Sequence, residues 1–113
     1  MTRFALIVVG TRNDAWGKLS RSKQSEFIAR VEQATREAGV VPVNGYRLSA
    51  TPGAFIEIWE GVSRAGIDRA VKGLQAMGYT RYVDARFLIG ERAVVEEIES
   101  QESEPQRAKS KSQ

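Results

Sequence analysis

Apolar residues recur along this chain with two different periods, and each change of period marks a new element. Residues 4–9 form a short, unbroken apolar run rich in β-branched side chains, which is typical of a strand buried on both faces. Across residues 20–38 the apolar spacing becomes three and four, which predicts an amphipathic helix capped by Ser20 or Ser22 and ended by Gly39. Its apolar stripe consists of Phe27, Ile28, Val31, Ala34 and Ala38.

The middle of the chain has the pattern of a β-hairpin. Residues 43–48 predict a second strand, and residues 49–53 (SATPG) carry the residue types of a turn. Residues 54–60 (AFIEIWE) alternate cleanly and predict a third strand that pairs with the second. The segment between the first strand and the first helix, residues 10–17 (GTRNDAWG), is expected to be a loop without a phosphate-binding fingerprint.

The last third of the chain repeats the change from helix to strand. Ser63 is expected to cap a second helix that ends at Gly78, and residues 81–89 predict a fourth strand. The stripe of this helix consists of Ile67, Ala70, Val71, Leu74 and Met77. A short amphipathic helix is expected next, and its apolar residues are Val94, Val95 and Ile98. We therefore predict one domain over residues 1–99 and a disordered polar tail over residues 100–113.

The predicted order β-α-β-β-α-β is that of the split βαβ motif. Right-handed crossovers would place the first and third strands at the centre of the sheet, in the order 4-1-3-2. The fold class is therefore α+β, a ferredoxin-like sandwich in which a four-stranded antiparallel sheet carries two helices on one face.

Alternation divides the third strand into two unlike faces. The small aliphatic face consists of Ala54, Ile56 and Ile58. The aromatic and acidic face consists of Phe55, Glu57 and Trp59. We expect the aliphatic set to pack beneath the helices, which would leave the second set on the helix-free face.

The neighbouring strands add charged residues to that expected helix-free face. Its further members are Arg47, Tyr82, Asp84, Arg86 and Leu88, with Tyr46 and Leu48 on the opposite side from Arg47. Arg47 and Glu57 are expected to lie directly opposite each other across the hairpin. A surface that is half aromatic and half charged is too apolar for water and too charged for an ordinary core. We therefore predict a homodimer through the helix-free face, because a second copy is the simplest cover.

Two absences from the composition restrict the chemistry. The chain has no cysteine, which excludes disulfides, thiol nucleophiles and thiolate metal sites within it. It also has no histidine, which excludes a Ser-His-Asp triad and His-ligated zinc, haem or iron built from its own residues. Catalysis would rest on Asp, Glu, Tyr, Lys or Arg, or on a borrowed cofactor or a carboxylate-held metal. Our prediction is that no cofactor and no metal take part.

The positive charge does not by itself indicate nucleic acid. The net charge is +3, but the arginines are scattered and no basic run occurs, so a solvated surface explains them. An RNA-recognition motif shares this element order and would use Phe55 and Trp59 on the open sheet face. The stretch TPGAFIEI lacks the basic-Gly-aromatic start of that motif, and two carboxylates on the same face would repel phosphates. With no long apolar run or signal peptide, no membrane association and a cytoplasmic location are expected.

Three segments together resemble the dimeric α/β-barrel superfamily. They are AWGKLSRSKQSEF (residues 15–27), AFIEIWE (54–60) and GYTRYVDARFLIGE (78–91), within a resemblance that covers residues 3–92. More narrowly, the chain is similar to small stand-alone, darcynin-like members with a Trp-x-x-Leu-Ser opening of the first helix. The resemblance implies a dimer of two sheets packed face to face, with a small pocket between sheet and helices in each subunit. Members include cofactor-independent monooxygenases, haem-degrading and chlorite dismutase-like enzymes, muconolactone isomerases and proteins without known activity. The haem branches use a proximal histidine, which this chain lacks.

Several residues are candidates for a site, and each also has a plain structural interpretation. Arg47, Glu57 and Arg86 would bind an anionic substrate and supply an acid or base, or would form an ion-pair network in the dimer interface. Trp16 would form a pocket wall or fix its loop, and Tyr46, Tyr79 and Tyr82 would be proton donors or core residues. The prediction assigns catalysis to Glu57, Arg86 and Tyr82 and substrate contact to Trp16, Arg47 and Trp59.

Two functional hypotheses follow from these candidates. The first is a small-molecule site, in a cofactor-independent oxygenase, isomerase or lyase that acts on a small aromatic or carbonyl compound. The alternative is a binding or interaction module without turnover. The sequence decides neither whether there is turnover nor which substrate is used.

Overall fold

The computed structural model describes residues 3–100. Its elements are β1 (Phe4–Arg12), α1 (Asp14–Gly17), α2 (Arg21–Glu37), β2 (Val41–Arg47), β3 (Ala54–Gly61), α3 (Arg64–Ala76), α4 (Tyr79–Tyr82) and β4 (Val83–Glu91). Residues 95–100 are also helical, as predicted. The rest of the expected tail, residues 101–113, lies outside the described residues. Within the described part of the chain, no helix is both long and apolar enough to cross a membrane.

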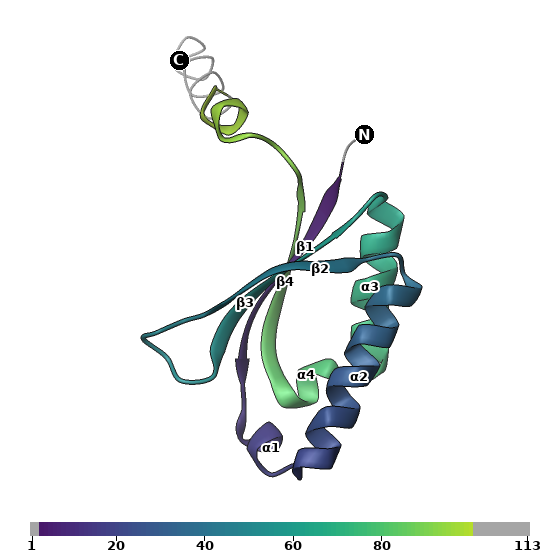
Figure 1. Cartoon of the computed structure of the whole chain (residues 1–113), viewed down its shortest axis with the longest axis vertical. Coiled ribbons are helices and arrows are strands. Elements are labelled where there is room, and N and C mark those ends of the chain that lie inside the picture. Colours follow the sequence, from purple (N-terminus) through teal and green to yellow (C-terminus); the bar gives the residue numbers. More distant parts are fainter. Residues whose placement is uncertain (1–2, 101–113) are drawn as a thin grey trace, which may run out of the picture.

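The four strands form one antiparallel sheet in the order β2-β3-β1-β4, with β1 and β3 at its centre. In Figure 1, α2 and α3 lie side by side against one face of this sheet, and the β2–β3 hairpin extends away from them. The predicted ferredoxin-like α+β sandwich is confirmed, including the strand order. In place of the expected loop at residues 10–17, β1 continues to Arg12 and a helical turn, α1, follows.

The predicted helix ends are also confirmed. The Ser20 and Ser63 hydroxyls cap α2 and α3 by accepting hydrogen bonds from the Lys23 and Gly66 amides, at 3.2 and 2.9 Å. Gly78, which follows α3, has a φ of 81°, a conformation that glycine adopts without strain. Gly66 allows a close contact between helices, because a Cβ there would lie 2.8 Å from the Ala38 carbonyl oxygen. The start of α3 therefore packs tightly against the end of α2.

The helices and the sheet enclose one apolar core. Leu6 and Val8 of β1 are almost fully buried in it, and they pack with Ile67, Ala70 and Leu74 of α3. The remaining members of this core are Phe27, Ala38, Val40, Trp59, Tyr79 and Val83. Ile28, which the helix pattern placed in the apolar stripe, is instead 43% exposed.

The predicted orientation of β3 is wrong. Trp59 is only 7% exposed, belongs to the core, and lies opposite Leu6 in the β1–β3 ladder. By alternation Glu57 and Phe55 share its face, so all three lie beneath the helices. Ile56 and Ile58 therefore point to the helix-free face. Phe55 can lie beneath the helices because its ring covers Gly10, where even a Cβ would come within 2.8 Å of it.

The predicted position of Arg47 needs two corrections. Arg47 lies opposite Phe55, and Glu57 lies opposite Gly45, so the hairpin register is shifted by two residues from the expected one. A shift of two keeps side chains on their faces. Arg47 therefore accompanies Glu57 beneath the helices but is not its direct partner, and Tyr46 lies on the helix-free face.

The outer strand β4 has the predicted orientation. Ala85 and Phe87 pack against the core, whereas Asp84, Arg86 and Leu88 share the helix-free face. Tyr82 is the exception: it ends α4 rather than starting the strand, and its ring meets the Phe27 ring edge-on at 5.2 Å. The helix-free face is thus mainly aliphatic, with Ile7 and Val9 of β1 at its centre. Because Phe55 and Trp59 are absent from it, the RNA-binding alternative loses its stacking surface.

Candidate functional site

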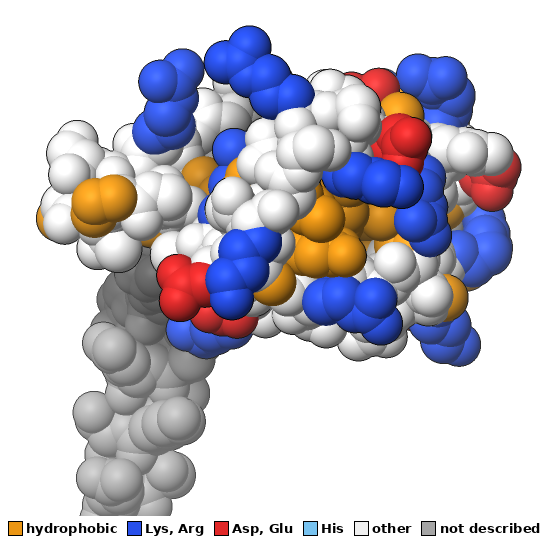
Figure 2. Space-filling view, turned by 90° about the horizontal axis from the view of Figure 1, so that it is seen from below, with side chains coloured by type: hydrophobic (Ala, Val, Ile, Leu, Met, Phe, Trp, Pro, Cys, Tyr) orange, Lys and Arg blue, Asp and Glu red, His pale blue; other side chains and the backbone are white. Residues whose placement is uncertain are grey.

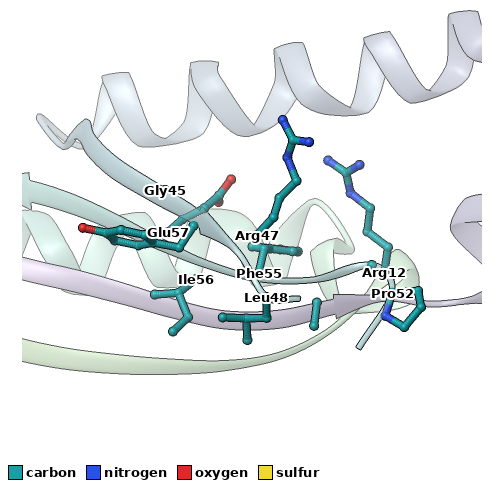
Figure 3. Close-up of a pocket in the computed structure, with 11 residues that line it drawn as sticks. Arg12, Gly45, Arg47, Leu48, Pro52, Phe55, Ile56 and Glu57 are labelled. Atoms are coloured by element: carbon teal, nitrogen blue, oxygen red, sulfur yellow. The ribbon is translucent and has the colours of Figure 1, made fainter. Parts of the chain in front are cut away.

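A groove separates α2 from the β2–β3 hairpin, on the helix-covered side of the sheet. Its outer part is a cavity of about 530 Å³ over the hairpin, and its inner part is a recess of about 150 Å³ beneath α2. Both parts are lined by Arg12, Phe55 and Glu57, so they adjoin at these three residues. Figure 3 shows Arg12, Arg47 and Glu57 directed toward the helix, whereas Ile56 and Leu48 point the other way.

The groove extends along the sheet in the other direction as well. A cavity of about 450 Å³ lies between the end of α2 and the start of β2. Its wall includes Glu32 and Arg36 of α2, and Glu57 and Trp59 of β3. Glu57 is thus common to every part of the groove.

The end of β1 and the short helix α1 hold Arg12 and Trp16 at the mouth of the groove. The Arg12 guanidinium lies over the Trp16 ring at 4.7 Å from its centroid and lies 6.0 Å from the Phe55 ring. Asn13 fixes this segment, since its side-chain oxygen caps α1 by accepting from the Trp16 amide at 3.2 Å. The Asn13 side-chain nitrogen donates to the Arg81 carbonyl oxygen at 3.0 Å, and the Asn13 amide donates to the Tyr82 carbonyl oxygen at 3.1 Å. The cation and its aromatic support are therefore held in place.

Aromatic rings form the inner end of the recess. Phe27 contacts Trp16 edge-on at 5.5 Å and stacks on Tyr79 at 5.7 Å between centroids. Tyr79 in turn packs on Phe87 at 5.8 Å. With Phe55 and Trp59 on the sheet side, the recess presents flat apolar walls of the kind that bind planar organic molecules.

Glu57 is the half-buried carboxyl group at the centre of the groove. Burial raises its pKa above the ordinary value of 4.5, while a hydrogen bond from the Trp59 side chain and the charge of Arg12 act in the opposite direction. In the described part of the chain no ion pair reaches this carboxylate. A carboxyl group with a raised pKa, aromatic walls and an adjoining cation is suited to accept or donate a proton.

Tyr79 is a further ionisable group in the recess, beside Glu57. Burial raises its pKa well above the ordinary value of 10.0, and the negative charge of Glu57 raises it further. Its hydroxyl therefore remains protonated over the whole physiological pH range and offers a hydrogen-bond donor rather than a base.

The structure brings together four of the six predicted site residues. Glu57, Trp59, Arg47 and Trp16 all line the groove. Arg86 lies on the opposite face of the sheet, opposite Val9, so it cannot act in the same site of one subunit. Tyr82 packs behind Phe27 and lines neither of the two adjoining cavities.

Sequence reasoning missed Arg12 and Phe27 as members of the site. Arg12 is separated by even steps from Leu6 and Val8, so alternation would have placed it on their face had β1 been extended to its true end. Phe27 was assigned to the core, which is correct, but no sequence signal showed that its ring also lines a recess. Among residues 3–100 no cluster of three or more acidic residues could hold a metal ion.

Comparison with known proteins shows the fold. No family model and no curated protein matches the chain. A mutant chlorite dismutase from Candidatus Nitrospira defluvii has a TM-score of 0.68 at 17% identity, covering 89% of this chain and 44% of that one. This chain therefore spans less than half the length of that enzyme.

Two further solved structures match over nearly their whole length. A mutant of SnoaB, a cofactor-independent oxygenase from Streptomyces nogalater, has a TM-score of 0.53 at 12% identity, covering 82% of this chain and 93% of that one. A DABB family protein with a ferredoxin-like fold from Mesorhizobium loti also has a TM-score of 0.53, at 14% identity, covering 84% and 99%. These matches confirm the predicted ferredoxin-like fold.

Proposed function

We propose that the groove beneath α2 binds a small aromatic compound that bears a carbonyl group, and that Glu57 exchanges a proton with it without a cofactor. The observation that carries this proposal is the position of Glu57, half-buried where the outer cavity and the aromatic recess adjoin. A ring held between Phe27, Phe55 and Trp59 would bring the carbon next to a carbonyl close to this carboxylate. In the step proposed, that carbon loses a proton to Glu57 and the electron pair moves to the carbonyl oxygen as an enolate.

Two features support chemistry at this position. The raised pKa makes Glu57 a stronger base than an exposed carboxylate when it is ionised. Arg12, whose charge already lowers that pKa, would favour the negative charge of the enolate. Such chemistry without a cofactor is compatible with the fold, because SnoaB is a cofactor-independent oxygenase. Loss of this proton would be a first step common to isomerases, lyases and oxygenases.

Hydrogen–deuterium exchange tests the proton transfer directly. Aryl alkyl ketones and arylacetaldehydes, which have a proton on the carbon next to the carbonyl, would be incubated in D₂O with the protein and followed by NMR. We expect the protein to accelerate exchange over buffer and Glu57→Gln to lose about a hundredfold of that acceleration. Glu60→Gln is the matched control, because Glu60 is on the same strand but faces the other way.

The outcomes separate the two functional hypotheses. Equal exchange rates with wild type and Glu57→Gln would contradict the role of Glu57. Binding of these compounds without any exchange would instead favour a binding module without turnover, the alternative reading of the same groove.

We also propose a homodimer through the helix-free face. The centre of this face is apolar and consists of Ile7, Val9, Ile56 and Ile58, while Asp84 and Arg86 lie on its outer strand β4. Tyr46 on the edge strand is 56% exposed. A contiguous aliphatic sheet face of this kind is normally covered, and an isologous partner presents the same apolar residues to it.

Light scattering tests the dimer. Wild type should have about twice the mass of the chain, and Ile58→Glu should shift it to monomer, because a charge in an apolar interface is not compensated. Val62→Glu is the control, since Val62 is an exposed apolar residue at the end of the hairpin strand. A monomeric wild type would contradict the proposal.

A further inference from the structure

Two arginine side chains reach into the outer cavity from different strands. Arg12 ends β1 and Arg47 ends β2, and both line the cavity of about 530 Å³. They flank Phe55, which pairs with Arg47 on one side and with Gly10, two residues before Arg12, on the other. Figure 3 shows both guanidinium groups on the same side of the hairpin, directed toward α2.

Neither arginine forms an ion pair in the described part of the chain, although the charge of Arg12 acts on the Glu57 carboxylate. The ion pairs found there are Lys23–Glu26, Arg64–Asp68 and Arg92–Glu60, all remote from this cavity. Glu57 is the acidic residue that lines the cavity together with the two arginines, so the cations outnumber it. Figure 2 views the molecule from below. It shows hydrophobic side chains at the centre of this side, bordered by several Lys and Arg side chains.

Arg12 is already oriented for binding. Its guanidinium carbon lies 4.7 Å from the centroid of the Trp16 ring, and this contact restrains the side chain at the mouth of the groove. An arginine held in this way loses little side-chain freedom when it forms the paired hydrogen bonds that a planar anion accepts.

The inner recess limits the size of what enters it. Its volume is about 150 Å³, which is the size of an engineered apolar cavity that holds one benzene ring. The recess adjoins the outer cavity, where the two cations lie, at the shared residues Arg12, Phe55 and Glu57. A ligand that fills both parts would therefore have one ring inside and a polar group outside.

We propose that Arg12 and Arg47 form an anion clamp, and that the ligand of the groove is a compound with a single aromatic ring and a carboxylate. The clamp holds the carboxylate at the mouth while Phe27, Phe55 and Trp59 hold the ring. This inference rests on the proposed function, because it names the ligand class of the same groove. It also explains why two arginines line an outer cavity whose acidic residue is Glu57 alone.

Tryptophan fluorescence offers a direct test, because both tryptophans of the chain, Trp16 and Trp59, line the inner recess. The protein would be titrated with benzoate and with its neutral counterpart benzyl alcohol. We expect benzoate to bind at least about tenfold more tightly, as hydrogen bonds to a charged group allow. Arg12→Gln and Arg47→Gln should each remove most of this preference and leave benzyl alcohol binding nearly unchanged. Arg86→Gln, on the opposite face, should keep it.

Each outcome decides a different claim. Equal or tighter binding of benzyl alcohol, or a preference that survives in both Arg12→Gln and Arg47→Gln, would overturn the clamp and leave the proposed function in place. A lack of binding by both compounds would overturn the ligand site, and the proposed function with it. 1-Naphthoate, which has two fused rings, should bind more weakly than benzoate, and tighter binding would overturn the one-ring limit. A normal thermal melt of each variant shows that it is folded.

Discussion

The two faces of the sheet differ more in chemistry than in apolar content. Beneath the helices β3 presents Phe55, Glu57 and Trp59, and on the other side it presents Ile56 and Ile58. Both rows are partly or fully buried in the single chain. Alternation therefore sorts the side chains of a central strand into two rows but does not say which row faces the helices.

The aromatic side chains of β3 face the helices for a physical reason, which is the distance between α2 and the hairpin. The two helices pack tightly where Gly66 meets the Ala38 carbonyl oxygen, whereas the hairpin extends away from them. Large side chains such as Trp59 are needed to reach across the widening space, and small aliphatic ones would leave it empty. Where even the aromatic residues do not fill it, the groove remains.

The largest expected effect on stability comes from truncating one side chain of each row of β3 to alanine. Trp59→Ala should lower the free energy of unfolding by about 3–5 kcal/mol at every protein concentration, because Trp59 belongs to the core of the single chain. Ile58→Ala should cost less, and its cost should depend on protein concentration if Ile58 lies in a dimer interface. Urea denaturation at low and high protein concentration measures both. A larger loss for Ile58→Ala would mean that the two rows are exchanged.

A smaller effect is expected at the point where the aromatic row meets β1. Gly10→Ala would place a Cβ 2.8 Å from Phe55 and 2.9 Å from Val83, so the Phe55 ring must move toward the groove. We expect a loss of about 1–3 kcal/mol in stability and weaker binding of aromatic ligands. Gly90→Ala is the matched control, since a Cβ there meets nothing within 4 Å. Similar behaviour of the two variants in thermal melts and in ligand titrations would show that Phe55 is not held by Gly10.

The smallest expected effect is on the pH dependence of stability. The folded protein raises the pKa of Glu57 above 4.5, so it holds a proton that the unfolded chain releases. Stability from this group is present in acid and is lost as the pH rises from the unfolded pKa through the folded one. Glu57→Gln should remove that loss and so become more stable, relative to wild type, as the pH rises above 4.5. Thermal melts over this range provide the measurement, and parallel curves for the two proteins would contradict the assignment.

The sequence was sufficient for the fold because its signals are local. The serine caps, the glycine stops and the change of period located both long helices, and chain order with right-handed crossovers led to the strand order. The sequence pattern also predicted which side chains of β4 face the core, because that strand has one aliphatic row and one charged row. It was not sufficient for β3, where Ile58 and Trp59 are both apolar enough to be buried.

The same ambiguity explains the site. Glu57, Trp59, Arg47 and Trp16 were singled out as unusual residues, and they do meet, but around a groove on the other side of the sheet. A pocket between sheet and helices was implied by the resemblance and not by the alternation. Arg12 escaped notice because its place depends on β1 continuing beyond Gly10, which no periodicity indicated.

The positions of the two indole rings test the central claim, that the aromatic and acidic row faces the helices and forms the ligand site. In ¹H–¹⁵N NMR spectra each tryptophan contributes one indole N–H signal, so the chain has two such signals. On titration with benzoate, we expect both indole signals to shift together while the methyl signals of Ile7 and Ile58 on the helix-free face stay in place. Shifts of the Ile7 and Ile58 methyl signals with unchanged indole signals would place the ligand on the other face and contradict this orientation.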